Sequence, residues 1–368
     1  MARSDSANLD LIRAAAVMCV FGAHLRDQLT GTGADISWAF GQMGVFIFFV
    51  HTSLVLMLSL ERSASRLASG PLVLDFFVRR FFRIYPLSVL CVTLAFLGFS
   101  QTHPGPWSWP TYLSNVALTM NLTYSEDMWP VLWTLPLEVQ MYLVLPVLFL
   151  VLRERPLGYA LGLWGLAVLS GVVQPQVSGR LTLAAYAPCF IGGVIAWRLM
   201  HTVRPRFHAA WWPLVFVASW TVWLLAERRG DPEYNRWMFC LTLGCLIPWF
   251  RDLQWTPLVA VARTVAKYSY GFYLAHFPVI VLAVAFDGPL RWFLLIGLGV
   301  LIPVAMYHLI EQPMIDVGRR LAARVATASM AGGTPLRIPW SVVPALRRLR
   351  QYALSVRVNL LRGSSGCD

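Results

Sequence analysis

The chain has 368 residues, of which 57% are hydrophobic and only 13% are charged, and its mean hydropathy is +0.60. A soluble domain carries about twice this charged fraction, so the composition excludes an ordinary soluble protein. It predicts an all-α fold, a polytopic transmembrane helical bundle. The formal net charge of +12 comes almost entirely from arginines spread among the segments between apolar stretches. This distribution argues against nucleic-acid binding and favours cytoplasmic loops.

Ten apolar stretches each come close to the length of about 20 residues that crosses the hydrocarbon core of a membrane. The first is expected to be a retained span rather than a signal peptide, because ionisable residues interrupt it and no cleavage site follows. A further apolar stretch over 109–122 is short and flanked by proline, so we expect it to be re-entrant or interfacial. The ten predicted spans lie near residues 9–26, 37–60, 84–101, 135–152, 156–174, 181–200, 210–227, 236–250, 268–286 and 290–310.

The distribution of basic residues sets the predicted orientation. The connections after the second, fourth, sixth and eighth spans are basic, whereas residues 101–130 contain no lysine or arginine. The positive-inside rule therefore predicts that both termini are cytoplasmic. Residues 1–315 are expected to form the transmembrane domain and residues 316–368 a basic cytoplasmic tail. Within this tail, apolar residues over 341–362 recur at helical spacing, which indicates a basic amphipathic helix on the inner membrane surface or, alternatively, a disordered segment.

The first span carries two ionisable residues on one side. Arg13 and His24 are eleven positions apart, which is roughly three helical turns plus 20°, so both project from nearly the same face about 16 Å apart along the axis. Ionisable residues inside a membrane usually face the bundle interior or a wet cavity and mark function. The alternative interpretation is a snorkelling arginine and a hydrogen-bonded core histidine.

A cluster of arginines precedes the third predicted span, within residues 76–86. Spacings of three and four residues place Arg79, Arg80 and Arg83 on one helical face, at the expected cytoplasmic end of that span. Guanidinium groups bind phosphate oxygens in pairs, so the cluster predicts a phosphate clamp. The alternative is a topology signal that contacts the headgroups of membrane lipids.

The fourth span begins with a potential catalytic carboxylate. Glu138 lies about one turn inside its outer end, and Tyr142 follows four residues later on the same face. A carboxylate here is suited to orienting or deprotonating a partner, or to receiving a substrate hydroxyl, and the alternative is a structural partner for an arginine. Three further ionisable residues in the predicted spans are, taken singly, expected to be structural: His51, His276 and Glu311.

Several common catalytic motifs are missing from the sequence. It contains no HExxH, P-loop, GxGxxG or GxSxG motif, and its six cysteines form neither a disulfide framework nor a paired metal spacing. An imidazole, a buried carboxylate and an arginine clamp suit general-base transfer of a group carried on a phosphate-bearing donor. The alternatives are a multi-span transporter of a polar or anionic solute, for which no internal repeat is found, and a non-catalytic membrane scaffold.

Six short motifs follow one another along residues 8–315. They are Arg13 with His24, Gly44-Val45 with Phe48-Phe49, the run from Arg80 to Pro86, Trp133-Thr134-Leu135 with Glu138, the run from Ser269 to Pro278, and Glu311-Gln312-Pro313. In this order the motifs resemble those of the integral membrane acyltransferase family 3, the O-acyltransferases of surface polysaccharides, lipids and some antibiotics. The sequence departs from the family pattern at His51-Thr52-Ser53, which bears on acceptor preference more than on reaction class.

The resemblance implies transfer of an acyl group, commonly acetyl, from acyl-CoA to a hydroxyl of a carbohydrate or lipid acceptor, without a metal, in the bacterial inner (cytoplasmic) membrane. For catalysis it implies His24 as the general base, with Glu138. The residues expected to bind the donor are Arg13, Arg79, Arg80, Arg83 and Tyr85. The residues expected to bind the acceptor are Trp133, Tyr142 and His276.

Overall fold

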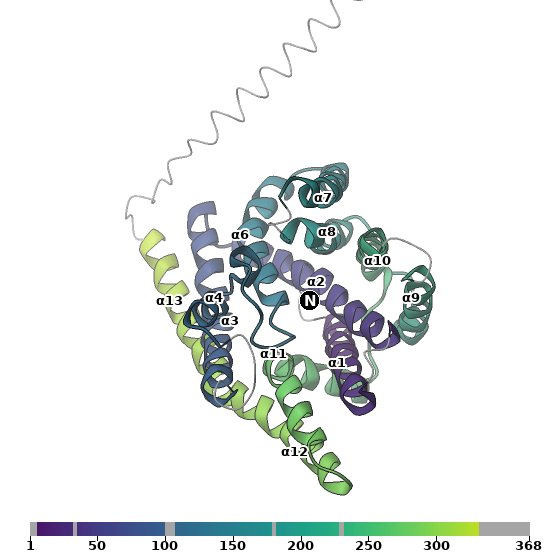
Figure 1. Cartoon of the computed structure of the whole chain (residues 1–368). Helices are drawn as coiled ribbons and strands as arrows, with labels where there is room; N and C mark the ends of the chain where they lie inside the picture. The colour runs from purple at the N-terminus through teal and green to yellow at the C-terminus, as the bar shows by residue number, and fades with distance from the viewer. Residues whose placement is uncertain (1–5, 32–34, 100–106, 179–181, 228–231, 331–368) are drawn as a thin grey trace, which may run out of the picture.

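The computed structural model of the chain describes residues 6–31, 35–99, 107–178, 182–227 and 232–330. Most of these residues are helical, and β structure among them is limited to one isolated bridge between Phe207 and Phe250. The predicted all-α helical bundle is confirmed (Figure 1). In chain order the α-helices are α1 (Ala7–Thr30), α2 (Asp35–Ala64), α3 (Ser69–Phe99), α4 (Trp109–Ala117), α5 (Met120–Thr123), α6 (Thr134–Leu152), α7 (Leu157–Val177), α8 (Leu183–Leu199), α9 (Trp212–Glu227), α10 (Pro232–Leu246), α11 (Thr256–Val284), α12 (Pro289–Met306) and α13 (Gln312–Met330).

Each of the ten predicted spans falls on one of these helices. Seven helical segments of the described chain are long and apolar enough to cross a membrane, and α8 is a shorter apolar helix. The predicted count of ten spans and the cytoplasmic position of both termini remain predictions. The seven segments are Ala7–Thr30, Ser37–Ala64, Ser69–Gly98, Thr134–Leu152, Leu157–Val177, Ala209–Ala226 and Pro289–Arg324.

Helix α2 is the central element of the bundle and packs against α1, α6, α8, α9 and α10 (Figure 1). Its most apolar window is 78% buried, compared with 11–50% for the other six candidate spans. Glycine permits two of these close approaches: a Cβ on Gly44 would lie 2.6 Å from the carbonyl oxygen of Ala16, and one on Gly193 would collide with that of Val50. The same helix that fills the core therefore also fixes the position of α1.

The third span differs from its prediction. The arginine cluster was expected at the cytoplasmic end of a helix that begins near residue 84, but α3 begins at Ser69 and includes Pro86 in its interior. Leu72 and Phe76 are buried apolar residues in this added part of the helix, and Asp75 forms an ion pair with Arg79 one turn later. Because these contacts satisfy the helix, the arginines lie near its middle. Helix α11 likewise begins at Thr256, well before the predicted residue 268.

The segment that was expected to be re-entrant or interfacial forms two short helices, α4 and α5. Helix α4 begins where the sequence provides a cap, because the hydroxyl of Ser108 accepts a hydrogen bond from the backbone N–H of Thr111 and a proline lies in the first turn. The loop that follows is held by Asn115, whose side chain contacts the backbone of Glu126 and Met128. This loop leads directly into α6.

The end of the described chain is a long helix that changes character. Helix α12 passes into a π-helical turn, Tyr307–Glu311, and then into α13, which packs along α3 at one side of the molecule (Figure 1). Gly318 of α13 faces Phe82 of α3. The predicted boundary between domain and tail, at 315/316, therefore falls inside α13, and the amphipathic segment predicted over 341–362 lies outside the described residues.

Large apolar side chains cover the outside of the peripheral helices, as expected for a surface in contact with lipid. On α6, α7 and α12 they include Leu143, Val147, Val151, Leu166, Leu169, Val173, Phe293, Ile296 and Val300. The polar residues discussed below lie instead between the helices. The interior of this protein is thus more polar than its surface at the same depth.

Candidate active site

Five helices, α1, α2, α3, α6 and α11, enclose a cavity with an empty space of about 730 Å³ including its mouth. This size falls within the range of about 300–1,000 Å³ typical of small-molecule sites. Charged and hydroxyl groups gather on its wall from elements far apart in the sequence: Arg13, His51, Thr52, Arg80, Arg83, Thr134, Glu138, Tyr142, Ser269, Tyr270 and Tyr273. We call this space the arginine cavity.

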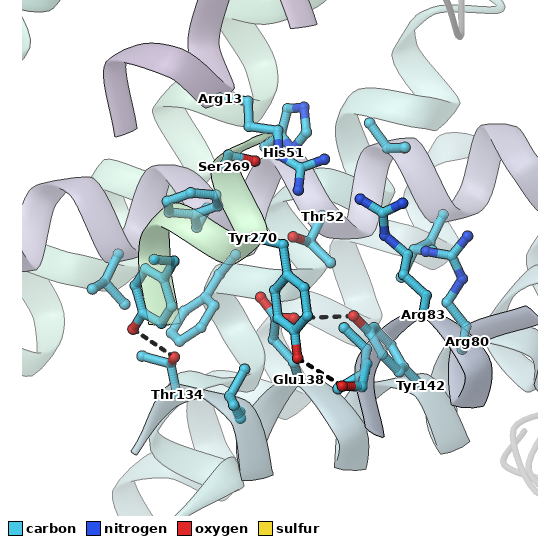
Figure 2. A pocket seen from close by; sticks show the side chains of 18 residues that line it. Arg13, His51, Thr52, Arg80, Arg83, Thr134, Glu138, Tyr142, Ser269 and Tyr270 are labelled. Atoms are coloured by element: carbon cyan, nitrogen blue, oxygen red, sulfur yellow. Dashed lines mark hydrogen bonds between the residues drawn. The ribbon is translucent and has the colours of Figure 1, made fainter. Parts of the chain in front are cut away.

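Three guanidinium groups define its character. Figure 2 shows those of Arg13, Arg80 and Arg83 along one side of the space, with Thr134 at the other. Arg13 comes from α1, whereas Arg80 and Arg83 are three residues apart on α3 and therefore share a face. The Nε of Arg13 is buried and has no hydrogen-bond partner among the described residues. A buried N–H without a partner is costly, so an acceptor group in the cavity would relieve it.

A buried carboxylate partly balances these charges. Glu311, from the π-helical turn, has a fully buried side chain, and its Oε1 lies 3.5 Å from a guanidinium nitrogen of Arg83. Neither carboxylate oxygen has a hydrogen-bond partner of good geometry within the described chain. Arg13 is also close enough to interact electrostatically with Arg83, Glu311 and Glu138. Three guanidinium groups thus face two carboxylates, which leaves the site favourable for an anion.

Hydroxyl groups complete the wall. Tyr142 donates a hydrogen bond to Glu138 over 3.0 Å, one turn apart on α6 as the spacing predicted. Tyr270 donates to the carbonyl oxygen of Ile84 over 2.8 Å, and the hydroxyls of Tyr273 and Thr134 are also 2.8 Å apart. These bonds join α6 and α11 to each other and α11 to α3, and so fix the shape of the cavity.

The structure does not bring every predicted donor-binding residue to the cavity. Arg79 turns away and binds Asp75 through its Nε at 2.9 Å. Tyr85 stacks on Phe81 and its hydroxyl lies 3.4 Å from the carbonyl oxygen of Ala117. The predicted clamp of three consecutive-turn arginines is thus reduced to Arg80 and Arg83, and Arg13 joins them from another helix.

The two histidines that were predicted separately are in contact. The Nδ1 of His24 lies 3.0 Å from the Nε2 of His276, because α1 packs along α11. The rings of Phe21, Phe272 and Phe277 surround them. We call His24 and His276 the histidine pair. Neither of them is among the residues that line the arginine cavity.

One tyrosine connects the two regions. Tyr273 lines the cavity, and its ring centroid lies 5.8 Å from that of His276. Arg13 and His24 lie at two levels of α1, as their spacing predicted, with the cavity at the level of Arg13. Of the predicted acceptor residues, Tyr142 is in the cavity, whereas Trp133 packs against Phe49 and Tyr186.

Comparison with known proteins agrees with this arrangement. A family model described as an acyltransferase domain matches residues 6–309. The chain belongs to the integral membrane acyltransferase family 3. Nodulation protein 10 of Rhizobium leguminosarum bv. viciae is 28% identical over 364 residues, which cover 86% of this chain and 95% of that protein. No solved structure matches the chain.

Membership of this acyltransferase family establishes an integral membrane enzyme with an acyl donor and an acceptor. The family match favours the enzyme over the transporter and the scaffold that composition alone leaves open. Within the described residues, no group of three or more His, Cys, Asp and Glu side chains is arranged to hold a metal ion.

Sequence reasoning missed part of the acyltransferase cavity. His51, which the sequence left as structural, is 5% exposed and lies beside Arg13 in the cavity (Figure 2). Thr52, Ser269 and Tyr270 also line it. The available signal was the departure of residues 51–53 from the family pattern, since a residue that replaces a common one in a core span is a candidate for a changed site.

Proposed function

We propose that this acyltransferase moves an acyl group, acetyl by preference, from cytoplasmic acyl-CoA to a hydroxyl of a carbohydrate or lipid acceptor in the bacterial inner membrane. The observation that carries the proposal is the convergence of three arginines from two helices on one cavity, in a chain whose family transfers acyl groups. Acyl-CoA is the acyl donor that combines a reactive thioester with several phosphates.

The donor phosphates are proposed to bind Arg80 and Arg83, with Arg13 deeper along the same side. Paired N–H groups of guanidinium match phosphate oxygens and form charge-assisted hydrogen bonds. The unpartnered Nε of Arg13 supports a ligand acceptor at this point. Glu311 keeps Arg83 in place through their ion pair.

His24 is proposed to act as the general base. It takes the proton of the acceptor hydroxyl while the oxygen attacks the thioester carbonyl, and the C–S bond then breaks. The departing thiolate takes up that proton, so the histidine returns to its neutral state. General-base catalysis contributes about 10²- to 10⁴-fold to a rate, and correct positioning of the two substrates contributes further.

The separation of binding from chemistry suits a long donor. Eleven residues of α1 correspond to about 16 Å, a distance that an extended pantetheine arm can bridge. Tyr273 lies at the boundary between the arginine cavity and the histidine pair, so its side chain is the group that the thioester must pass. The acceptor is proposed to approach from the outer side, near Trp133 and Glu138, with Tyr142 and His276 as further acceptor contacts.

The proposal is tested with full-length protein in membrane vesicles supplied with acetyl-CoA labelled in the acetyl group. We expect label to appear in an ester of an envelope carbohydrate or lipid, and mass spectrometry of the envelope from cells that lack the protein to show loss of that ester. Uptake of label without ester formation would contradict the proposal and support solute transport. A panel of longer acyl-CoA donors in the same assay measures the preference for acetyl.

A further inference from the structure

The hydrogen bonds of His276 determine where its proton lies. Its Nδ1 is 2.7 Å from the carbonyl oxygen of Tyr273 and 3.2 Å from that of Phe272. A carbonyl oxygen can only accept a hydrogen bond, so the Nδ1 must carry a proton. This contact is built into α11, because a side chain at position i reaches the carbonyl groups of residues i−3 and i−4.

The surroundings of His276 favour a neutral ring. The residue is 2% exposed, and the ring of Phe272 lies parallel to it with 5.9 Å between the centroids. The ring of Phe21 contacts it from another direction. Burial of an unpaired imidazolium among apolar rings is costly. With its single proton on Nδ1, neutral His276 has its lone pair on Nε2.

This lone pair faces His24. The Nδ1 of His24 lies 3.0 Å from the Nε2 of His276, and only an N–H on His24 makes this contact a hydrogen bond. Neutral His24 then carries its single proton on Nδ1, which leaves the lone pair on Nε2. The chain of hydrogen bonds runs from His24 through His276 to the backbone of Tyr273.

We propose that His276 is a positioning residue that fixes His24 in the tautomer with a free Nε2, the atom that accepts the proton of the acceptor hydroxyl. This inference rests on the proposed function, in which His24 is the base. It gives His276 a role through His24 instead of contact with the acceptor. The wrong tautomer in such an arrangement places an N–H where a base is needed, and this removes general-base catalysis while binding is retained.

Two variants of nearly equal size test the role of the Nε2 of His276. His276→Gln retains a carbonyl oxygen that can accept from His24, whereas His276→Met has no comparable acceptor. With full-length protein in vesicles and acetyl-CoA as the donor, we expect His276→Met to lower kcat by about 10²-fold, the lower end of a general-base contribution. The KM for acetyl-CoA should stay unchanged, and His276→Gln should recover most of the lost rate.

Equal kcat losses in both variants, at matched thermal unfolding midpoints, would overturn the positioning role and favour direct contact with the acceptor. Retention of full activity in both would overturn it as well. Neither result bears on whether the protein transfers acyl groups, since that activity is measured in the unaltered protein. Full activity in His24→Ala would instead remove the base that the proposed function requires.

A spectroscopic measurement reads the tautomer without any turnover. In full-length protein labelled with ¹⁵N-histidine in lipid nanodiscs, the signals lost in His24→Ala belong to His24, one of seven histidines in the chain. We expect its proton on Nδ1 in the unaltered protein and in His276→Gln, and on Nε2, wholly or in part, in His276→Met. A proton on Nε2 of His24 in the unaltered protein would overturn the inference, and so would an Nδ1 proton retained in full in His276→Met.

Discussion

The arginine cavity and the histidine pair lie along the same helix, α1, but differ in their physical character. The cavity gathers three guanidinium groups around open space, and one buried N–H on its wall has no partner in the described chain. The pair consists of two imidazoles in a chain of hydrogen bonds that ends on a backbone carbonyl, packed among phenylalanine rings. The first region is suited to receive a charged ligand and the second to hold one proton at a defined atom. Substitutions should therefore separate affinity from turnover.

The largest effect is expected for His24→Ala. Loss of the base should lower kcat by about 10²- to 10⁴-fold, while the KM for acetyl-CoA stays near that of the unaltered protein because the arginine cavity is intact. Steady-state release of CoA at several donor concentrations measures both constants, and thermal unfolding in detergent verifies folding. A raised KM with little change in kcat would reverse the assignment of the two regions.

The next effect is expected for Arg83→Ala. A hydrogen bond to a charged group contributes about 1.5–3 kcal/mol, so the KM for acetyl-CoA should rise roughly 10- to 100-fold with kcat retained at saturating donor. The substitution also leaves Glu311 buried without its partner. The double variant Arg83→Ala with Glu311→Gln removes this second problem. A donor KM that returns to normal in the double variant would show that Arg83 does not bind the donor.

A smaller effect is expected for Tyr142→Phe. Without this hydroxyl, Glu138 loses its hydrogen-bond donor and should interact more closely with the arginines. One such bond contributes about 0.5–1.5 kcal/mol, so we expect a rise in donor KM of about twofold to tenfold. Tyr270→Phe is the matched control, since that hydroxyl in the same cavity donates to a backbone carbonyl. Equal changes in both variants would assign the effect to cavity shape.

The smallest effect on the donor is expected for Arg79→Ala. Because Arg79 binds Asp75 outside the cavity, the KM for acetyl-CoA should change by less than about twofold, which is below the effect of one neutral hydrogen bond. Asp75 is only 3% exposed, so the loss of its partner should lower the unfolding temperature. A large rise in donor KM at unchanged stability would restore Arg79 to the phosphate clamp.

The apolar pattern was sufficient to predict the helices, since all ten expected ranges fall on them, but not their ends. Residues 76–86 look like a charged junction, and only the structure shows that burial of Leu72 and Phe76 and the Asp75–Arg79 ion pair extend α3 through it. A charge at the edge of an apolar run marks the edge of a membrane only where no neighbour in the bundle satisfies it.

The site was predictable in its residue types and not in its contacts. Arg13, Arg83 and Glu138 do meet in one cavity, but no periodicity within a single span reports which spans are neighbours. His24 and His276 are 252 positions apart, so their hydrogen bond depends on the packing of α1 along α11. The same holds for Arg83 and Glu311, which are brought together from α3 and the end of α12.

The π-helical turn at Tyr307–Glu311 has a consequence for how the length of this protein can vary. Such a turn accommodates one residue more than the regular helix. Its excision would restore ordinary winding and rotate all that follows by about 100°, which would displace Gly318 from its seat on Phe82 and change the direction of Glu311. Gene-level insertions and deletions should therefore be excluded from this short stretch, even though substitutions on the lipid side, such as at the 75% exposed Leu309, should be harmless.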